Sequence, residues 1–74
     1  MTRLGPISPK KLEKVLLKMG FTPTRQSGSH VFYKHPDGRC TTIPFHGNYE
    51  IGVVLLCKIL KETKVSREEF ERCL

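Results

Sequence analysis

The sequence has few of the features that the larger functional classes require. Its 74 residues contain no tryptophan, 7 acidic residues against 13 Lys and Arg, and three widely spaced cysteines without a Cys-x-x-Cys pair. Such a cysteine set is neither a disulfide framework nor a zinc signature. The longest apolar run, Val53 to Cys57, is five residues, well below the roughly 20 that cross a bilayer. The amino terminus has no apolar signal segment. We therefore expect one domain over residues 1–74, with no membrane span and a cytoplasmic location.

Several catalytic motifs are also missing. No paired carboxylates, glycine-rich phosphate loop or Ser-His-Asp set can be assembled from this sequence, which excludes acid hydrolases and nucleotide-driven motors. A chain of this length has a thin core and leaves no room for a deep, enclosed substrate pocket. Any chemistry must therefore take place on an open surface.

The sequence has an excess of positive charge, and this excess is concentrated in one half of the chain. The formal net charge is +6; residues 1–39 carry eight Lys and Arg against two acids, whereas residues 40–74 carry five of each. A one-sided basic field is typical of a protein that binds a polyanion such as nucleic acid. The alternative to polyanion binding is that the lysine-rich face of the first helix is simply exposed to solvent. The candidate RNA contacts are Lys10, Lys11, Lys14, Lys18, Arg25, Lys34 and His46.

Hydrophobic periodicity predicts the element order α-β-β-β-α-α. A helix over residues 10–19, begun by Ser8 and Pro9, has apolar residues at i, i+3, i+4 and i+7. Strands are expected over residues 21–26, 29–35 and 40–44, with turns at 27–28 and 36–38. A second helix is expected over about residues 50–62, capped by Asn48, and a capping box at residues 66–69 starts a short third helix. This order predicts an α+β fold, a two-layer sandwich with helices on one face of a three-stranded antiparallel sheet.

Two features of these elements bear on burial. Alternation places His30, Phe32 and Lys34 on one face of the middle strand, but aromatic residues occur on both faces, so the pattern does not tell which face is covered. The second helix is apolar almost all round and is expected to be buried against the sheet. Cys57 and Cys73 are interpreted as small apolar core residues.

The three histidines are the candidates for acid–base chemistry. His30 follows a Gly-Ser turn at the start of a strand, where its imidazole can project and exchange a proton near neutral pH. His46 lies in the loop before the second helix, and His35 precedes a proline and is most simply a turn residue. A histidine at a strand end is more often a surface or packing residue than a catalyst. A metal site built from these histidines and Cys40 is disfavoured, because they lack the close spacing of zinc modules.

Several motifs together resemble the HicA toxin family. They are Lys18-Met19-Gly20-Phe21, Gly28-Ser29-His30, His35-Pro36-Asp37-Gly38-Arg39, Ile43-Pro44-Phe45-His46, Glu50-Ile51-Gly52, Lys58-Ile59-Leu60 and Ser66-Arg67-Glu68-Glu69-Phe70. Each is weak alone, but together they cover nearly the whole chain in the right order. The resemblance implies a fold like that of double-stranded-RNA-binding domains, metal-free and cofactor-free cleavage of messenger RNA, and inhibition by a HicB-like antitoxin.

The resemblance also implies roles for individual residues. His30 would be the catalytic residue, and Gly28 and Ser29 would form the turn that exposes its ring. Lys34 and the lysines of the first helix are candidates for the positive charge near the scissile phosphate. A second proton-transfer group is not evident, and His46 is one candidate.

The sequence departs from the family pattern at two positions, and it leaves other functions open. Val54 stands where the family usually has glycine, and Cys57 stands where it usually has a basic residue. The second of these removes a charge that could touch RNA or antitoxin. Two rival functions stay open: a non-catalytic RNA-binding module of the same fold, and a protein-interaction domain whose basic helix docks an acidic partner.

Overall fold

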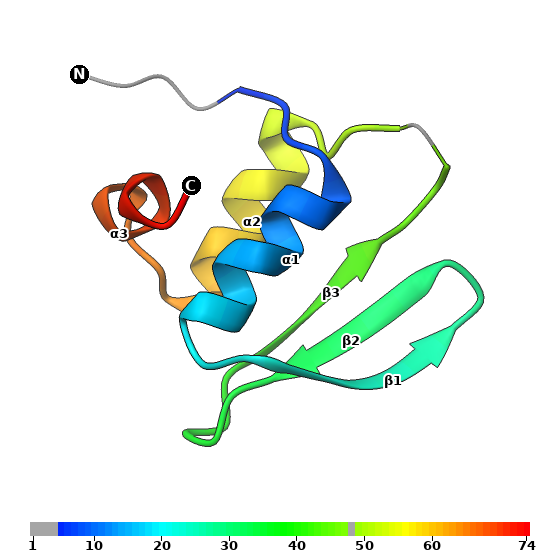
Figure 1. Cartoon of the computed structure of the whole chain (residues 1–74), viewed down its shortest axis with the longest axis horizontal. Helices are drawn as coiled ribbons and strands as arrows, with labels where there is room; N and C mark the ends of the chain where they lie inside the picture. The colour runs from blue at the N-terminus through cyan, green and yellow to red at the C-terminus, as the bar shows by residue number, and fades with distance from the viewer. Residues whose placement is uncertain (1–4, 48) are drawn as a thin grey trace.

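The computed structural model describes residues 5–47 and 49–74, and it has the predicted element order (Figure 1). The elements in chain order are α1 (Pro9–Lys18), β1 (Thr22–Ser27), β2 (His30–Lys34), β3 (Cys40–Pro44), α2 (Val53–Thr63) and α3 (Arg67–Arg72). This is the α+β architecture that the sequence predicts, with boundaries of α1 and the strands shifted by one residue at most of their ends.

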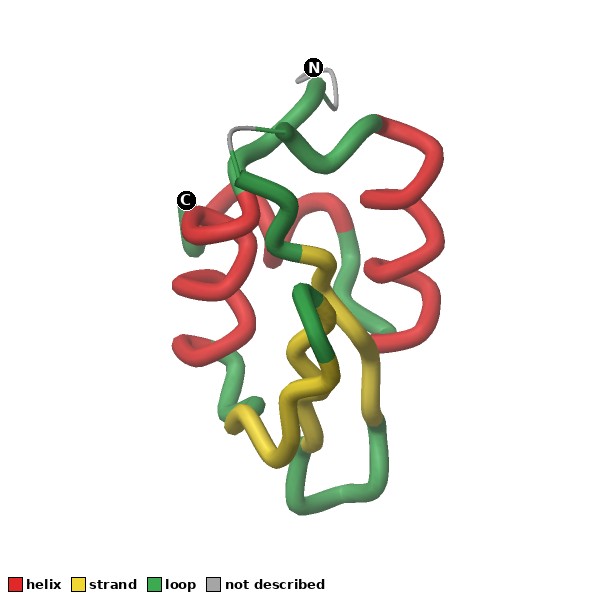
Figure 2. The backbone as a smooth tube through the Cα atoms, turned by 90° about the vertical axis from the view of Figure 1, so that its right-hand side faces the viewer, coloured by secondary structure: helices red, strands yellow, loops and turns green. Residues whose placement is uncertain are grey.

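The sheet is antiparallel with the order β1-β2-β3, and the helices lie on one side of it (Figure 1). Tyr33 of β2 and Ile43 of β3 are buried toward the helices, whereas Phe32 lies on the opposite, outer face and is only partly covered. The structure therefore settles which face of β2 is covered. Every residue of β1 is exposed, as expected of an edge strand that contains Pro23. Figure 2 shows the strands continuing past the ends of the two longer helices.

Local signals define α1 at both ends. The Ser8 hydroxyl accepts a hydrogen bond from the Lys11 N–H at 3.1 Å, and Pro9 occupies the first turn, where its missing N–H costs nothing. The helix ends at Lys18 with Met19 as its C-cap, and Gly20 follows with φ of +99°. The predicted cap and stop are both confirmed.

The start of α2 differs from the prediction. Residues 50–52 are not helical, because Ile51 forms an isolated antiparallel bridge with Ile7, with N–O distances of 2.7 and 3.1 Å. The helix begins at Val53 after Gly52, which provides no side-chain cap. Asn48, the predicted cap, lies outside the described residues. A pairing between segments 44 residues apart is not visible to local sequence patterns, and here it overrides them.

The expectation that α2 is buried nearly all round is wrong. Its buried residues are Leu56, Ile59, Leu60 and Thr63, which form a single face. Val54 is 87% exposed, and Cys57 is exposed as well. The helix contacts the sheet on one side only, so the apolar residues on its other side remain at the surface.

The core lies between the sheet and the helices and draws on every element except β1. Its buried hydrophobic members are Ile7, Leu12, Val15, Leu16, Phe21, Tyr33, Ile43, Ile51, Leu56, Ile59, Leu60, Val65 and Phe70. Phe70 comes from α3, which begins at the predicted capping box between Ser66 and Glu69. Cys73 packs against this core, with its Sγ 3.7 Å from the Met19 sulfur. Within the described residues, no helix has the length and apolar character of a membrane-spanning segment.

Candidate functional site

The turn between β1 and β2 positions His30. Gly28 has φ of +59°, a left-handed conformation that glycine adopts at little cost. The Gln26 side chain donates to the Gly28 carbonyl at 3.0 Å, and the Ser29 carbonyl accepts from the Phe45 N–H at 2.6 Å. The turn is thereby held to both neighbouring segments. His30 begins β2 with an exposed side chain, so its ring is available to a ligand.

The β2–β3 register brings His46 to His30. His30 pairs with Pro44, and the chain then leaves β3 and places His46 two residues further on. The two imidazole rings meet edge to face, with centroids 5.5 Å apart and planes at 87°. The Ser29 Oγ lies 3.1 Å from Nδ1 of His46. We call Ser29, His30 and His46 the histidine site.

The outer face of the sheet extends from the histidine site. Phe32 shares this face with His30, and the guanidinium of Arg25 lies over the Phe32 ring, 4.6 Å from its centroid. Lys34 is on the same face but four residues from His30, about 13 Å along the strand. The structure therefore places Arg25, from the neighbouring strand, closer to the histidine site than Lys34.

The lysines of α1 do not gather at the histidine site. Lys10 lines a groove of about 590 Å³ together with residues of the loop that carries His46, including Gly47 and the 78% exposed Tyr49. Lys14 and Lys18 instead line a hollow beside Cys73, and the Lys18 ammonium donates to the Cys73 carbonyl at 3.1 Å. Lys11 lines that hollow too. Of the four lysines, only Lys10 borders the loop of His46 in this way.

His35 has a different environment. Its ring packs against Phe21 with centroids 5.1 Å apart, its Nε2 would lie 3.0 Å from a Cβ at Gly20, and its Nδ1 accepts from the Asp37 N–H. It therefore supports the packing of the turn, as its sequence context suggests. Over residues 5–47 and 49–74, no three His, Cys, Asp or Glu side chains are grouped so that they could hold a metal ion.

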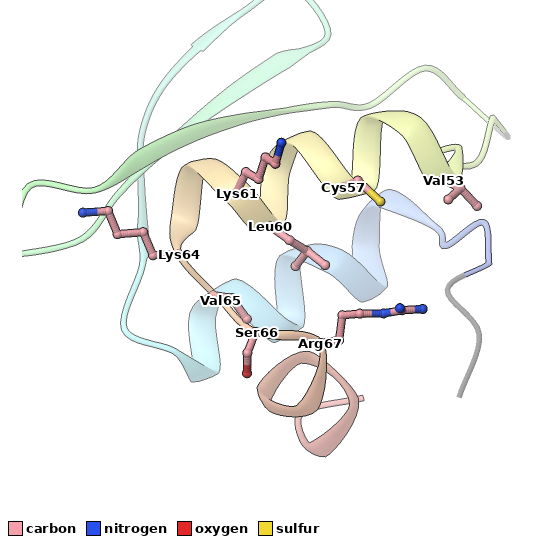
Figure 3. A pocket seen from close by; sticks show the side chains of 8 residues that line it. All are labelled: Val53, Cys57, Leu60, Lys61, Lys64, Val65, Ser66 and Arg67. Carbon is pink, nitrogen blue, oxygen red and sulfur yellow. The ribbon is translucent and has the colours of Figure 1, made fainter. Parts of the chain in front are cut away.

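A second groove lies between α2 and α3, away from the histidine site (Figure 3). It encloses about 750 Å³, and its lining includes Val53, Cys57, Leu60 and Val65. Leu60 and Val65 point into it, while the amino groups of Lys61 and Lys64 point away (Figure 3). The exposed Cys57 thus belongs to an apolar surface and not to the core.

Two relationships at the site were missed by sequence reasoning. The first is the contact between the rings of His30 and His46, and the second is the position of Arg25 over Phe32. The first had a usable signal: the turn at residues 36–38 fixes the pairing of His35 with Arg39, and counting outward from it places His30 opposite Pro44. The second depends on an irregular strand register near Pro23, which the sequence pattern does not predict.

The fold and site define a class: a small basic α+β domain with two exposed, contacting imidazoles beside an open sheet face. The family model described as the HicA toxin of bacterial toxin–antitoxin systems matches residues 9–65, well over half of the chain. This chain therefore belongs to the HicA toxin family. A comparison with curated proteins returned no match. Membership in the family makes the chain a toxin that has an antitoxin partner.

Proposed function

We propose that this chain is an endoribonuclease that cleaves messenger RNA without a metal ion or other cofactor, and that His30 transfers a proton in the reaction. The contact between His30 and His46 on an exposed surface carries this proposal. An imidazole can remove the proton of a ribose 2′-hydroxyl or protonate a departing 5′-oxygen near neutral pH. Gly28 and Ser29 support the site by forming the turn before His30.

The RNA backbone would follow the outer face of the sheet and the groove beside the His46 loop. Arg25 supplies a cation and Phe32 an aromatic face on the first of these surfaces, and Lys10 and Tyr49 offer the same pair of groups on the second. Bases stack on exposed aromatic rings, and cations hold the phosphates. Lys11, Lys14, Lys18 and Lys34 lie further along the surface and would contribute a more distant field.

The direct experiment is cleavage of a defined messenger RNA in excess EDTA by the wild type and by His30→Ala. We expect the wild type to cleave and the variant to lose activity by about 10²- to 10⁴-fold, the usual contribution of a general acid or base. Glu68→Gln, an exposed change on α3, is the matched control and should cleave normally. Equal cleavage by the wild type and His30→Ala would remove His30 from the mechanism.

The rival RNA-binding module predicts a different result. In that case the wild type binds RNA with a clear salt dependence but leaves it intact. A binding slope near zero in log K against log[salt] would instead favour the protein-interaction domain.

We also propose that the antitoxin is a HicB-like protein and that the toxin acts in the cytoplasm, where messenger RNA is translated. Expression of the wild type should arrest bacterial growth, and His30→Ala should relieve the arrest. Co-expression of the product of the adjacent gene should relieve it as well. Arrest that persists with His30→Ala would contradict the catalytic role of His30.

A further inference from the structure

The ring of His46 has neighbours on two sides. Its Nδ1 lies 3.1 Å from the Ser29 hydroxyl, and its ring edge meets His30. Of these three side chains, His30 and His46 are exposed and Ser29 is partly covered. The two imidazoles therefore face solvent, and one nitrogen of His46 already contacts the Ser29 hydroxyl.

From this geometry we infer that His46 is the second proton-transfer group, and that Ser29 is a positioning residue that leaves Nε2 of His46 free to deliver a proton. The inference rests on the proposed ribonuclease function. The Ser29 hydroxyl can accept from Nδ1–H of the protonated ring, and it can still do so after Nε2 has lost its proton. The contact thus fits His46 both before and after proton transfer.

The two imidazoles divide one transesterification between them. The 2′-oxygen forms a bond to phosphorus as its proton passes to the ring of His30. The bond between phosphorus and the 5′-oxygen breaks as a proton passes from Nε2 of His46 to that oxygen. The products are a 2′,3′-cyclic phosphate and a 5′-hydroxyl, and no metal, water or redox partner enters the balance. Rings in contact can reach two oxygens of the same phosphodiester, as this division requires.

The assignment of His30 as base and His46 as acid follows from which imidazole ring another side chain holds. A general acid gains from a ring whose orientation is fixed, and the contact with Ser29 restrains the ring of His46. The structure gives His30 no such side-chain partner among the described residues, apart from the ring of His46. Lys10, Tyr49 and Glu50 are the charged or titratable residues that line the groove beside the loop of His46.

The test compares two RNA substrates that differ at one atom. In one the 5′-oxygen of a single linkage is ordinary, and in the other it is replaced by sulfur, which leaves without needing a proton. His46→Ala should cleave the oxygen substrate about 10²- to 10⁴-fold more slowly than the wild type and the sulfur substrate at nearly the wild-type rate. His30→Ala should remain slow on both. Ser29→Ala should show a weaker form of the His46→Ala pattern, and Ser29→Thr, which keeps the hydroxyl, should restore cleavage of the oxygen substrate.

The pH profile is an independent readout. With a base that must be neutral and an acid that must be protonated, the wild type should give a bell-shaped profile. His46→Ala should lose the alkaline decline, because that decline reports loss of the acid's proton. A residue that only contacts RNA would slow both substrates equally and leave the bell shape in place.

The outcomes separate this inference from the function on which it rests. If the wild type leaves both substrates intact, the ribonuclease proposal fails and the inference falls with it. If the wild type cleaves but sulfur does not restore His46→Ala, or if His46→Ala cleaves the oxygen substrate normally, only the role of His46 is overturned. Because His46 is exposed, its substitution should leave the circular dichroism spectrum and melting temperature unchanged.

Discussion

The Tyr33 hydroxyl donates a hydrogen bond to Oε2 of Glu13 at 2.5 Å, joining the central strand to α1. Tyr33 is 1% exposed. Burial raises the pKa of the Tyr33 phenol far above its ordinary value, and the hydrogen bond and negative charge of Glu13 raise the pKa further. Burial and Glu13 therefore both favour the protonated phenol in the folded chain.

This pKa shift predicts a loss of stability in alkali. Below about pH 10, the ordinary pKa of tyrosine, folded and unfolded chains both keep the proton and stability is unaffected. Above pH 10 the unfolded chain loses the proton while the folded chain retains it, so the free energy of unfolding falls as pH rises. Urea denaturation between pH 8 and 11 measures this slope.

Tyr33→Phe is the control for that slope. The variant should be less stable at pH 7 by about 1 kcal/mol, because it loses one hydrogen bond, and its stability should fall less steeply above pH 10. Parallel slopes in the two proteins would show that other groups cause the alkaline loss.

The parts of the fold that the sequence predicts correctly depend on neighbouring residues. Ser8 and Pro9 start α1, and the box between Ser66 and Glu69 starts α3; both signals act within one helical turn. The predicted start of α2 is wrong because Ile51 pairs with Ile7. That contact depends on how the complete fold brings distant segments together.

The same distinction applies to the histidine site. The exposed position of His30 follows from the local Gly-Ser turn, so it could be predicted. Its contact with His46 depends on the register between β2 and β3, which becomes visible only when the strand pairing is counted outward from the turn at residues 36–38. The predicted burial of α2 is wrong for a related reason: composition cannot show that only one face of this helix is covered.

Arg39 is expected to stabilise the fold. Its guanidinium donates to the Thr63 carbonyl at the end of α2 at 2.5 Å, and it lies 5.2 Å from the centroid of the Phe21 ring. Arg39→Met should lower the free energy of unfolding by about 1–3 kcal/mol, since the part-buried Thr63 carbonyl loses its charged hydrogen bond, while the exposed ion pair of Arg39 with Asp37 adds little.

Arg25→Met is the matched variant for this prediction. Arg25 also lies over an aromatic ring, but on the open face of the sheet, so the variant should cost no more than about 1 kcal/mol. Chemical denaturation of both variants gives the comparison. Equal losses would mean that the carbonyl of Thr63 contributes nothing.

The two ends of α1 should differ in their effect on RNA binding. Lys10 borders the groove beside the His46 loop, whereas Lys18 donates to the Cys73 carbonyl beside α3. Lys10→Gln should weaken RNA binding and reduce the salt slope by about 0.7, the value for one phosphate contact with a single strand. Lys18→Gln, with the same change of charge on the same helix, should leave the slope nearly unchanged. Equal slopes for the two variants would show that RNA does not follow the groove beside Lys10.

Gly28 provides a test of the turn that presents His30. A residue with a side chain at φ of +59° pays roughly 1–2 kcal/mol unless, like asparagine, it tolerates the left-handed region. Gly28→Ala should therefore lower both stability and RNA cleavage, and Gly28→Asn should recover most of each. Gly5→Ala is the control, because a Cβ at Gly5 meets nothing within 4 Å and its φ is not in the left-handed range. No Cβ contact opposes substitution at Gly28 either, so a difference between the Ala and Asn variants isolates backbone conformation as the cause.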